Sequence, residues 1–564
     1  MSEALYKAIR DAALENAVKF GGKANPKALV GKIVGQFSEQ KSRMGELMKE
    51  IAEITEEVNA LDPQKQQEAL DETGFVKQEK KKIDPMKDLE NAKTGNVVMR
   101  FAPSASGPMH IGHAFTGGLS SLYVKKYGGK LILRIEDTNS DNIDPAAYDA
   151  LVRDGNWIFG NIGEVVIQSD RLEIYYKYAR SLFGKGTLYV CTCTPEAFKE
   201  VVTQQIPCQC RAASIPDQEK RFERMFDKYE GFKEGEAVVR IKADMAHKNP
   251  AMRDFPLLRI NDSQHPRVGK KFRVWPLMNF AVLVDDIELG ISHVIRGKDH
   301  ADNARRQELL YKALEVTPPV SYFTGKYKFE GMDLSTSQTR ESISTGQYEG
   351  WADIRLPFLI PLKRRGYQAG ALLEYARMNG LSQVDKVIPK DEFFKTLDAF
   401  NKDIIDPVAT RHFFVHQPQA LTIDCVKEVE LALHPDMKTH GGRKFTVANS
   451  VLVEKEDVDP AALIRLMDFC NISYDGGTWK VHSESYEDFK AHTGVKKIIH
   501  WLPDDAQQLQ KVTVRMPDNS VVTGFGESQV LNKELGDVIQ FERFGFCRLD
   551  SIKDGAYNFW YGHN

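Results

Sequence analysis

Apolar and polar positions repeat with different periods along the chain, and the changes of period divide it into segments. Up to about residue 95 the period is helical, because apolar residues recur at spacings of three and four: Met44, Leu47, Ile51, Ile54, Val58 and Leu61. This seam predicts a long helix or helical hairpin that packs on its own protein, and a dedicated partner-binding helix is the less favoured alternative. The lysine-rich stretch 77–85 breaks the period and predicts a linker.

Strands and helices alternate after the linker. The sequence predicts a strand at 97–99, a loop rich in Pro, Ser and Gly, a helix at 113–126 and a strand at 130–135. A crossover of this length favours a parallel strand pair, the unit of nucleotide-binding α/β sheets. Residues 164–167 and 291–295 predict further strands of that sheet, the second after a long insertion.

The pattern changes again beyond about residue 400. Short alternating segments, such as 511–515 and 520–523, are separated by Gly, Pro, Asp and Asn. This arrangement predicts an all-β C-terminal domain.

Length and charge restrict the class of protein. The 564 residues are 27% charged and 42% hydrophobic, which predicts a soluble protein of roughly three to four domains. The 76 Lys and Arg against 79 Asp and Glu exclude a protein held on nucleic acid by bulk charge, so a nucleic-acid surface has to be local. The absence of an apolar run of about 18 residues predicts no membrane span. Acidic residues near the N-terminus are unlike a targeting peptide, so we expect a cytoplasmic protein. The oligomeric state is left open, with a monomer favoured.

The most informative segment joins the first predicted strand of the sheet to its first helix: Arg100-Phe-Ala-Pro-Ser-Ala-Ser-Gly-Pro-Met-His-Ile-Gly-His113. The segment resembles the HIGH motif of class I aminoacyl-tRNA synthetases, and the residues before it resemble the glutamyl and glutaminyl branch. In such a motif Gly112 would let the backbone approach an adenine ring, and the helix N-terminus favours phosphates. His110 and His113 could then donate hydrogen bonds to charge developing on an α-phosphate. Two helix-starting histidines without catalytic use are the alternative.

Further segments extend the resemblance over residues 95 to 350: 133–138, 168–171, 252–254, 274–276, 284–286 and 293–300. A thinner match at 401–407 and 499–503 resembles the anticodon-binding part of archaeal-type glutamyl enzymes. The resemblance implies an α/β fold with a Rossmann-like class I catalytic core, a helical N-terminal extension and an all-β, double β-barrel C-terminal domain. It divides the chain into the extension (1–94), the first half of the core (95–187), an acceptor-binding insertion (188–285), the second half of the core (286–345), a helical junction (346–400) and the anticodon-binding domain (401–564).

The activity implied by this resemblance is that of an ATP-dependent glutamate–tRNA ligase that uses Mg²⁺. Such an enzyme forms glutamyl adenylate from L-glutamate and transfers the glutamyl group to the 3′ end of the tRNA for glutamate. Charging of the tRNA for glutamine is left open. A glutaminyl enzyme and a tRNA-binding protein that has lost catalysis are the alternatives.

Arg296 separates glutamate from glutamine within this branch. In the resembling family this arginine faces the substrate side-chain carboxylate, whereas glutaminyl enzymes have a small neutral residue there. A bidentate guanidinium partner removes most of the cost of burying a carboxylate, so glutamate is favoured. A structural salt bridge from Arg296 to Asp286 or Asp299 is the alternative.

Other substrate contacts are implied by the resemblance alone. Arg100 and Ser104 join Arg296 in the glutamate site, and Glu136 receives the α-ammonium group. Asp299 and His300 are expected on the ribose and adenine side of ATP.

The second ATP motif of the class, KMSKS, has its best match at Asp333-Leu-Ser-Thr-Ser337, where both lysines are missing. Gln338 follows the match, and Arg340 lies two residues further on. Either Arg340 or a nearby lysine substitutes, or the hydroxyls of Ser335 and Ser337 and backbone amides suffice for ATP. A polar surface loop without function is the alternative.

Four of the seven cysteines form two C-x-C pairs, Cys191 with Cys193 and Cys208 with Cys210. Four thiolates on two short turns can close a tetrahedral, structural Zn²⁺ site. Four reduced cysteines without metal are the alternative.

Basic residues interleave with aromatic residues at 363–367 and 411–414. Lys and Arg can contact phosphates, and aromatic rings can stack on unpaired bases. These two segments are therefore candidate tRNA contacts.

Overall fold

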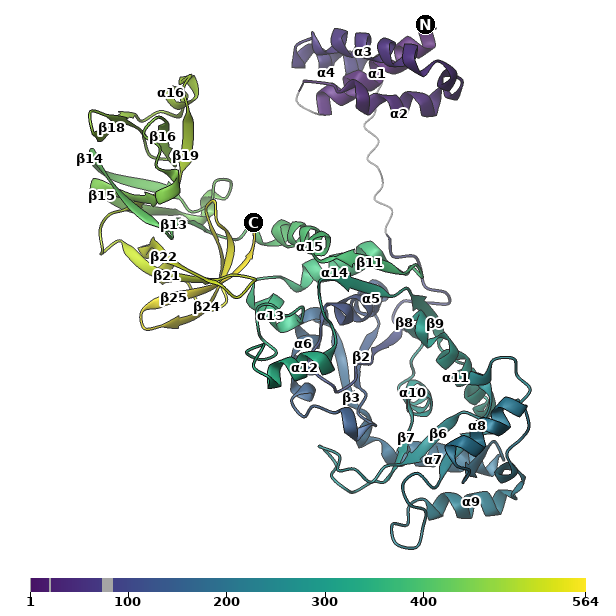
Figure 1. The fold of residues 1–564 in the computed structure, drawn as a ribbon. Coiled ribbons are helices and arrows are strands. Elements are labelled where there is room, and N and C mark those ends of the chain that lie inside the picture. The colour runs from purple at the N-terminus through teal and green to yellow at the C-terminus, as the bar shows by residue number, and fades with distance from the viewer. Residues whose placement is uncertain (1, 20–21, 74–84) are drawn as a thin grey trace. The chain divides into compact units, whose positions relative to one another are not determined.

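The computed structural model describes residues 2–19, 22–73 and 85–564, so the predicted linker lies almost wholly outside the described residues. The chain forms two compact units, Met1–Asp84 and Pro85–Asn564 (Figure 1). Within the described ranges, no helix is both long and apolar enough to cross a membrane.

The N-terminal unit consists of four helices, α1 (Glu3–Lys19), α2 (Pro26–Gln36), α3 (Met44–Asn59) and α4 (Pro63–Glu72). The predicted seam lies mainly on α3, where Leu47, Ile51, Ile54 and Val58 are buried in the core of this unit. The expectation of one long helix or hairpin is wrong. Asn25 and Asp62 cap new helices that begin with proline, which divides the segment into shorter helices packed on one another.

The second unit is built on a parallel sheet of β1 (Val98–Phe101), β2 (Lys130–Ile135) and β3 (Ile162–Ile167), which confirms the predicted strand pair. The crossovers contain α5 (Ile111–Tyr127) and α6 (Ala147–Phe159). The parallel pair β8 (His293–Gly297) and β9 (Val320–Thr324) lies beside β1, because the backbone N–H of Ser292 donates to Val98 O at 2.9 Å. The late strand predicted at 291–295 therefore adjoins the sheet.

An insertion separates the two halves of this core. Its antiparallel sheet has the order β4 (Leu188–Cys191), β5 (Val238–Ile241), β6 (Pro256–Ile260) and β7 (Val274–Pro276). Three helices accompany it, α7 (Leu172–Gly184), α8 (Pro195–Gln204) and α9 (Ile215–Arg224). The chain then returns through α10 (Met278–Glu288), so this helix joins the insertion to β8.

Helices and a small parallel sheet follow the core. The helices are α11 (Ala301–Leu314), α12 (Thr336–Ser344), α13 (Leu359–Arg364), α14 (Ala369–Asn379) and α15 (Lys390–Ile405), and the sheet pairs β10 (Tyr327–Glu330) with β11 (Lys386–Pro389). α14 packs on α5, which places this helical region against the first crossover of the core.

The C-terminal part is β-rich, as predicted, and contains two barrel-like sheets of seven strands. One sheet has the order β12 (Arg411–His412), β23 (Val538–Phe541), β24 (Gly545–Lys553), β25 (Ala556–His563), β21 (Leu509–Arg515), β22 (Val521–Glu527) and β13 (Phe414–Val415). The other has the order β19 (Lys496–Ile499), β16 (Leu463–Leu466), β17 (Asn471–Asp475), β18 (Thr478–Ser483), β14 (Pro418–Ala432), β15 (Gly442–Glu454) and β20 (Leu502–Pro503), with α16 (Tyr486–Ala491) between β18 and β19. The chain contributes β12 and β13 to the first sheet, then forms the whole second sheet, and finally completes the first sheet with β21 to β25.

Internal contacts occupy the side chains of the two basic and aromatic segments. Arg364 Nε donates to Asp550 at 2.8 Å, and Arg365 Nη2 donates to a backbone carbonyl of β25 at 2.8 Å. Phe413 and Phe414 are buried in the β-rich part. Arg364 and Arg365 thus tie the helical region to the strands, and tRNA contact by the two segments stays a prediction.

Candidate active site

A cavity of about 240 Å³ opens at the carboxyl ends of β1, β2 and β8. Ligands of parallel α/β sheets bind at this edge. The lining residues come from these strands and from α5, α10 and α11: Arg100, Phe101, Ala102, Gly112, His113, Thr116, Glu136, Met278, Val282, Ile295, Arg296, Gly297, His300 and Gln307.

The structure brings together only part of the predicted site. Six predicted residues line the cavity: Arg100, Gly112, His113, Glu136, Arg296 and His300. His110 stacks on His113, with ring centroids 3.8 Å apart. Five predicted residues lie outside the lining: His110, Ser104, Asp299, Ser335 and Ser337. Of these, Ser104 is exposed and pairs through its backbone with Glu136.

The two histidines begin α5 by capping each other. His110 Nδ1 accepts from the backbone N–H of Gly112 at 3.1 Å, and His113 Nδ1 accepts from that of His110 at 3.2 Å. A ring nitrogen that accepts a hydrogen bond bears no proton, so each neutral ring has its proton on Nε2. A Cβ at position 112 would lie 3.0 Å from His110 Cε1, which favours glycine there.

Both rings are uncharged near neutral pH. Burial lowers the pKa of His113 to about 4, and burial together with the adjacent His113 lowers the pKa of His110 well below its usual value. The start of α5 therefore offers two Nε2–H donors without adding positive charge to the helix end.

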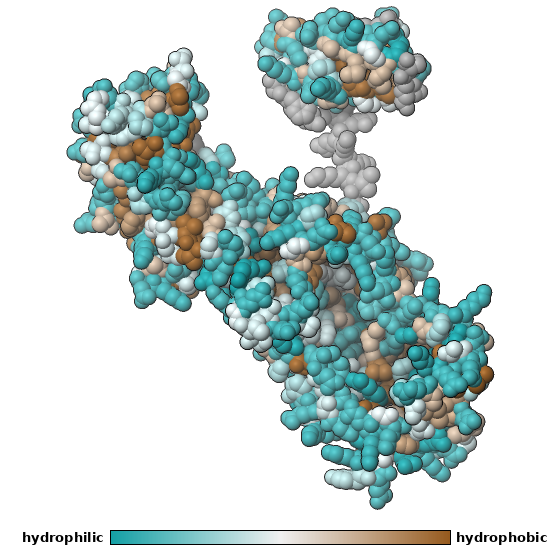
Figure 2. All heavy atoms as spheres, in the orientation of Figure 1, coloured by the Kyte–Doolittle hydropathy of each residue, from teal (hydrophilic) through white to brown (hydrophobic). Residues whose placement is uncertain are grey.

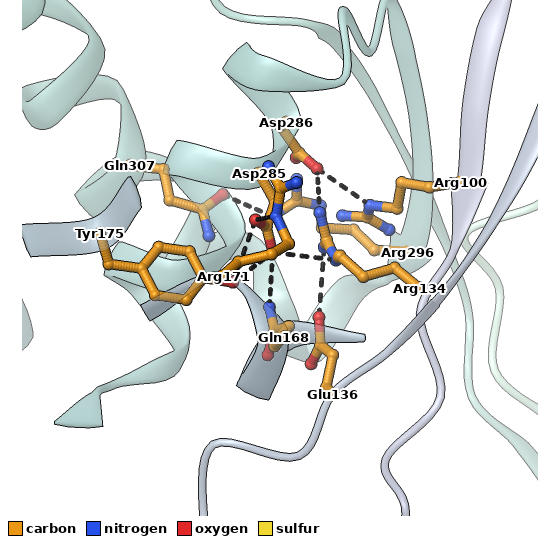
Figure 3. Close-up of polar contacts among 10 residues, drawn as sticks. All are labelled: Arg100, Arg134, Glu136, Gln168, Arg171, Tyr175, Asp285, Asp286, Arg296 and Gln307. Carbon is orange, nitrogen blue, oxygen red and sulfur yellow. Dashed lines mark hydrogen bonds and ion pairs between the residues drawn. The ribbon is translucent and has the colours of Figure 1, made fainter. Parts of the chain in front are cut away.

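A network of charged side chains lies beside the cavity (Figure 3). Asp286 Oδ1 accepts from Arg134 Nη1 at 2.6 Å and from Arg100 Nε at 3.4 Å. Arg134 Nη2 also donates to Glu136 at 3.2 Å. Burial opposes ionisation of Asp286, but Arg100 and Arg134 hold the pKa of this carboxyl below its usual value. Asp286 is therefore an anion that links β1 to β2.

Asp285 is the second buried carboxylate of the network. It accepts from Arg171 Nε at 2.7 Å, from Gln168 Nε2 at 2.9 Å and from the hydroxyl of Tyr175. Gln168 and Arg171 lie between β3 and α7 and Tyr175 lies on α7, so Asp285 ties α10 to that region.

The network contains more cations than anions. The ten side chains in Figure 3 include four arginines, at positions 100, 134, 171 and 296, and three acidic residues, at 136, 285 and 286. One positive charge is therefore left over when all seven groups are ionised.

Arg296 is the cation without an acidic partner. It is 8% exposed, and its Nη1 donates to Gln307 Oε1 at 3.0 Å. Burial and the neighbouring Arg100 lower its pKa to about 10, so it remains protonated near neutral pH. In the part of the chain that the structure describes, no carboxylate oxygen lies within 4.0 Å of its nitrogens. The alternative of a structural salt bridge to Asp286 or Asp299 is therefore wrong.

The KMSKS-like loop lies against the segment that precedes His110. Thr336 Oγ1 is 3.3 Å from Ser106 Oγ, and Arg340 Nη2 donates to the carbonyl oxygen of Ser106. Ser335 Oγ caps α12, and Ser335 and Ser337 Oγ lie 3.1 Å apart. The loop thus brings a guanidinium group, and no lysine, to the HIGH-like segment.

The four cysteines of the insertion converge. Their Sγ atoms all lie within 4.8 Å of one another, and Cys193 Sγ is 3.2 Å from Cys208 Sγ and 3.9 Å from Cys210 Sγ. Tetrahedral Zn²⁺ with Zn–S bonds of about 2.3 Å requires sulfur atoms about 3.8 Å apart. Backbone N–H groups also donate to Cys208 and Cys210 Sγ, as expected around thiolates. The cluster fits a structural zinc ion.

Sequence comparison decides the family. The catalytic domain of class I tRNA synthetases (E and Q) matches residues 96–407. The anti-codon binding domain of the same synthetases matches residues 409–492 and 498–550. The chain belongs to this synthetase family.

The synthetase is similar to archaeal proteins over nearly its whole length. It is 42% identical to the glutamate–tRNA ligase of Methanocaldococcus jannaschii, covering 98% of both chains. It is 41% identical to that of Methanobrevibacter smithii, covering 100% of this chain and 99% of the relative. The glutamate–tRNA ligase of Pyrococcus abyssi is 39% identical, with 96% of each chain covered. The resemblance inferred from the motifs is confirmed.

Sequence reasoning missed several residues of the synthetase site. Arg134 carried a signal, because it is a charged residue within the apolar stretch Leu131-Ile-Leu-Arg-Ile135. Asp285 and Asp286 lie in a segment recognised for its resemblance, but the sequence does not show that they pair with arginines from three other elements. Gln307 carried no signal, because it is an ordinary polar residue of a helix.

The low pKa of His113 predicts a pH dependence of stability. Between about pH 6.5, its unfolded pKa, and about pH 4, the unfolded chain binds a proton that the folded chain does not. The free energy of unfolding therefore falls as the pH falls. From about pH 7.5 to about pH 5.5, the wild type should lose roughly 1 kcal/mol more than His113→Gln.

Thermal unfolding at both pH values measures this difference. The matched control His482→Gln, an exposed histidine on β18, should behave as the wild type. An equal pH response in His113→Gln and the wild type would contradict the account.

Proposed function

We propose that the chain is a glutamate–tRNA ligase. With ATP and Mg²⁺ it activates L-glutamate as glutamyl adenylate, and it then transfers the glutamyl group to the 3′ end of the tRNA for glutamate. The observation that carries the proposal is the buried Arg296 guanidinium, whose side-chain hydrogen-bond partner is a neutral amide. The glutamate–tRNA ligases that it resembles over nearly their full length support the proposal.

Charge balance favours glutamate over glutamine. The side-chain carboxylate of glutamate supplies the one negative charge that the seven-group network lacks. The amide of glutamine would leave Arg296 as an uncompensated buried cation, which is costly in a low-dielectric site. The neutral side chains Met278 and Val282 line the same cavity and add no competing anion.

The remaining contacts orient the amino acid. Arg100 joins Arg296 at the carboxylate end, and Glu136 receives the α-ammonium group. Glu136 is the single carboxylate among the lining residues, so it is the group with the charge for this role. Ser104, paired with Glu136 through the backbone, completes this side of the site.

ATP binds across the start of α5. Gly112 allows close approach of the adenine, and His300, with Asp299, lies toward the ribose and adenine. The Nε2–H groups of His110 and His113 donate to the α-phosphate as charge develops on it.

The reaction consists of two nucleophilic substitution steps, the first at phosphorus and the second at carbon. The α-carboxylate of glutamate attacks the α-phosphorus and pyrophosphate leaves. A terminal ribose hydroxyl of tRNA then attacks the carbonyl carbon, and AMP leaves. Positioning and charge stabilisation supply the catalysis, so no residue is assigned as an obligatory base.

Arg340 takes the place of the missing loop lysine. Its contact with Ser106 places a cation beside the HIGH-like segment, where departing phosphate charge develops, and Ser335 and Ser337 add hydroxyl donors.

Two of the six predicted parts of the chain bind tRNA in this proposal. The insertion, 188–285, receives the acceptor end, with its fold fixed by structural Zn²⁺ on the four cysteines, and the domain 401–564 reads the anticodon. Figure 2 shows hydrophobic residues on the face of this β-rich domain, and Tyr474 and Phe525 are among its exposed apolar side chains. Such side chains suit stacking of unpaired bases. The tRNA for glutamine is a second candidate substrate.

Arg296→Gln tests the amino-acid assignment. Aminoacylation by the variant should lose about 10²- to 10³-fold in kcat/KM for glutamate, because a buried carboxylate loses its charged partner. The variant should unfold at the same or a higher temperature, because an uncompensated cation is removed.

Arg305→Gln is the control for this test, since Arg305 is exposed on the same helix as Gln307. Glutamate charging that survives in Arg296→Gln, or wild-type protein that charges glutamine in preference, would refute the proposed function.

Arg340→Ala tests the loop cation. Aminoacylation should fall by about 10- to 100-fold in kcat, whereas Arg340→Lys should keep most of the activity because a cation remains. Initial rates at saturating glutamate and varied ATP measure both. Equal losses in the two variants would show that charge at position 340 is unimportant.

Cys208→Ser tests the zinc site. The variant should lose bound zinc, measured by elemental analysis, and should unfold at least about 4 °C lower than the wild type. Cys425→Ser, which alters a cysteine outside the cluster, should retain both properties. Wild-type protein that is fully folded and free of zinc would contradict the assignment.

A further inference from the structure

We propose that Gln307 determines specificity for glutamate by holding Arg296 through Oε1 and donating from Nε2 to the side-chain carboxylate of the substrate. The proposal rests on the proposed function and adds a residue to that site.

Gln307 lies where it can contact both Arg296 and a ligand. It is on α11, is 3% exposed, and lines the 240 Å³ cavity together with Arg296 and Arg100. Its Oε1 accepts from Arg296 Nη1 at 3.0 Å, and Figure 3 shows the amide oxygen directed at the arginine.

The arginine fixes the orientation of the amide. A guanidinium group only donates hydrogen bonds, so the amide must present its oxygen to Arg296 and turn its nitrogen away. Among the described residues Nε2 then has no acceptor, although it is buried. Buried donors in native proteins are nearly always satisfied, so an acceptor is supplied from outside the chain.

Two other donors nearby lack partners in the described structure. Arg296 Nε and the Tyr311 hydroxyl are buried without a hydrogen-bond partner. Both residues, with Gln307, line a second cavity of about 200 Å³ that shares Arg296 and Gln307 with the first. Arg296 and Gln307 also line the first cavity, and a charged donor beside a neutral donor matches the two oxygens of a carboxylate.

The neutral amide at position 307 also preserves the charge imbalance. A carboxylate there would pair with Arg296 and cancel the excess positive charge. Glutamine instead supports the guanidinium without neutralising it, so the substrate carboxylate remains the counter-ion.

Two variants separate this role from simple support of the fold. In Gln307→Met, similar in size and without polar atoms, the KM for glutamate should rise about ten- to a hundredfold. The KM for ATP should stay within about twofold of the wild-type value. In Gln307→Glu the KM for glutamate should rise further, and the melting temperature should equal or exceed that of the wild type, because the new carboxylate pairs with Arg296.

Initial rates of tRNA aminoacylation and thermal unfolding measure these effects in the full chain, with Glu308→Gln as the control. Glu308 is the exposed neighbour of Gln307 on α11, and its variant should retain the wild-type KM values.

Three results would overturn the proposal. The first is a KM for glutamate within about twofold of the wild type in Gln307→Met, which would assign Nε2 to water in the second cavity. The second is a parallel rise in both KM values with a lower melting temperature, which would indicate a structural role. The third is unfolding of Gln307→Glu below the wild-type temperature. Failure of the wild type to charge glutamate would instead refute the proposed function itself.

Discussion

The buried guanidinium of Arg296 is the interaction on which the account of this synthetase depends. Its hydrogen-bonded side-chain partner is the neutral Gln307, while Arg100 and Arg134 share the carboxylate of Asp286. Charges in a protein core are normally paired, so an unpaired cation beside a cavity destabilises the folded protein locally. In the proposed function, the side-chain carboxylate of glutamate restores the balance, so binding energy comes from the one group that distinguishes glutamate from glutamine.

The charged side chains around Arg296 come from elements that are distant in sequence. Arg100 lies in β1, Arg134 in β2 and Arg296 in β8, while Asp285 and Asp286 lie on α10, which follows the sheet of the insertion. The start of α5 meets the same cavity with the neutral imidazole of His113, on which the neutral ring of His110 stacks, so it adds donors without adding to the positive charge. Within one cavity, a positive charge can therefore select the amino acid while uncharged hydrogen-bond donors contact the phosphate.

Sequence reasoning predicted what local pattern controls. The HIGH-like segment, the parallel strand pair and the paired cysteines depend on residues close in the chain, and the structure contains each of them. The apolar seam on α3 predicted a helix, but its periodicity does not show which other helices pack against it. The sequence likewise does not show that Arg364 and Arg365 bond to distant strands, because a solvated arginine and a paired arginine look the same in sequence. The contact of Gln307 with Arg296 requires α11 and β8 to lie close together, and only the tertiary structure shows this.

The most direct measurement is a crystal structure of the wild-type protein with a non-hydrolysable analogue of glutamyl adenylate. The account predicts that the side-chain carboxylate oxygens lie about 3 Å from the guanidinium nitrogens of Arg296 and from Gln307 Nε2. A carboxylate bound to another cation or directed to solvent, with Arg296 still bonded to Gln307 alone, would contradict it.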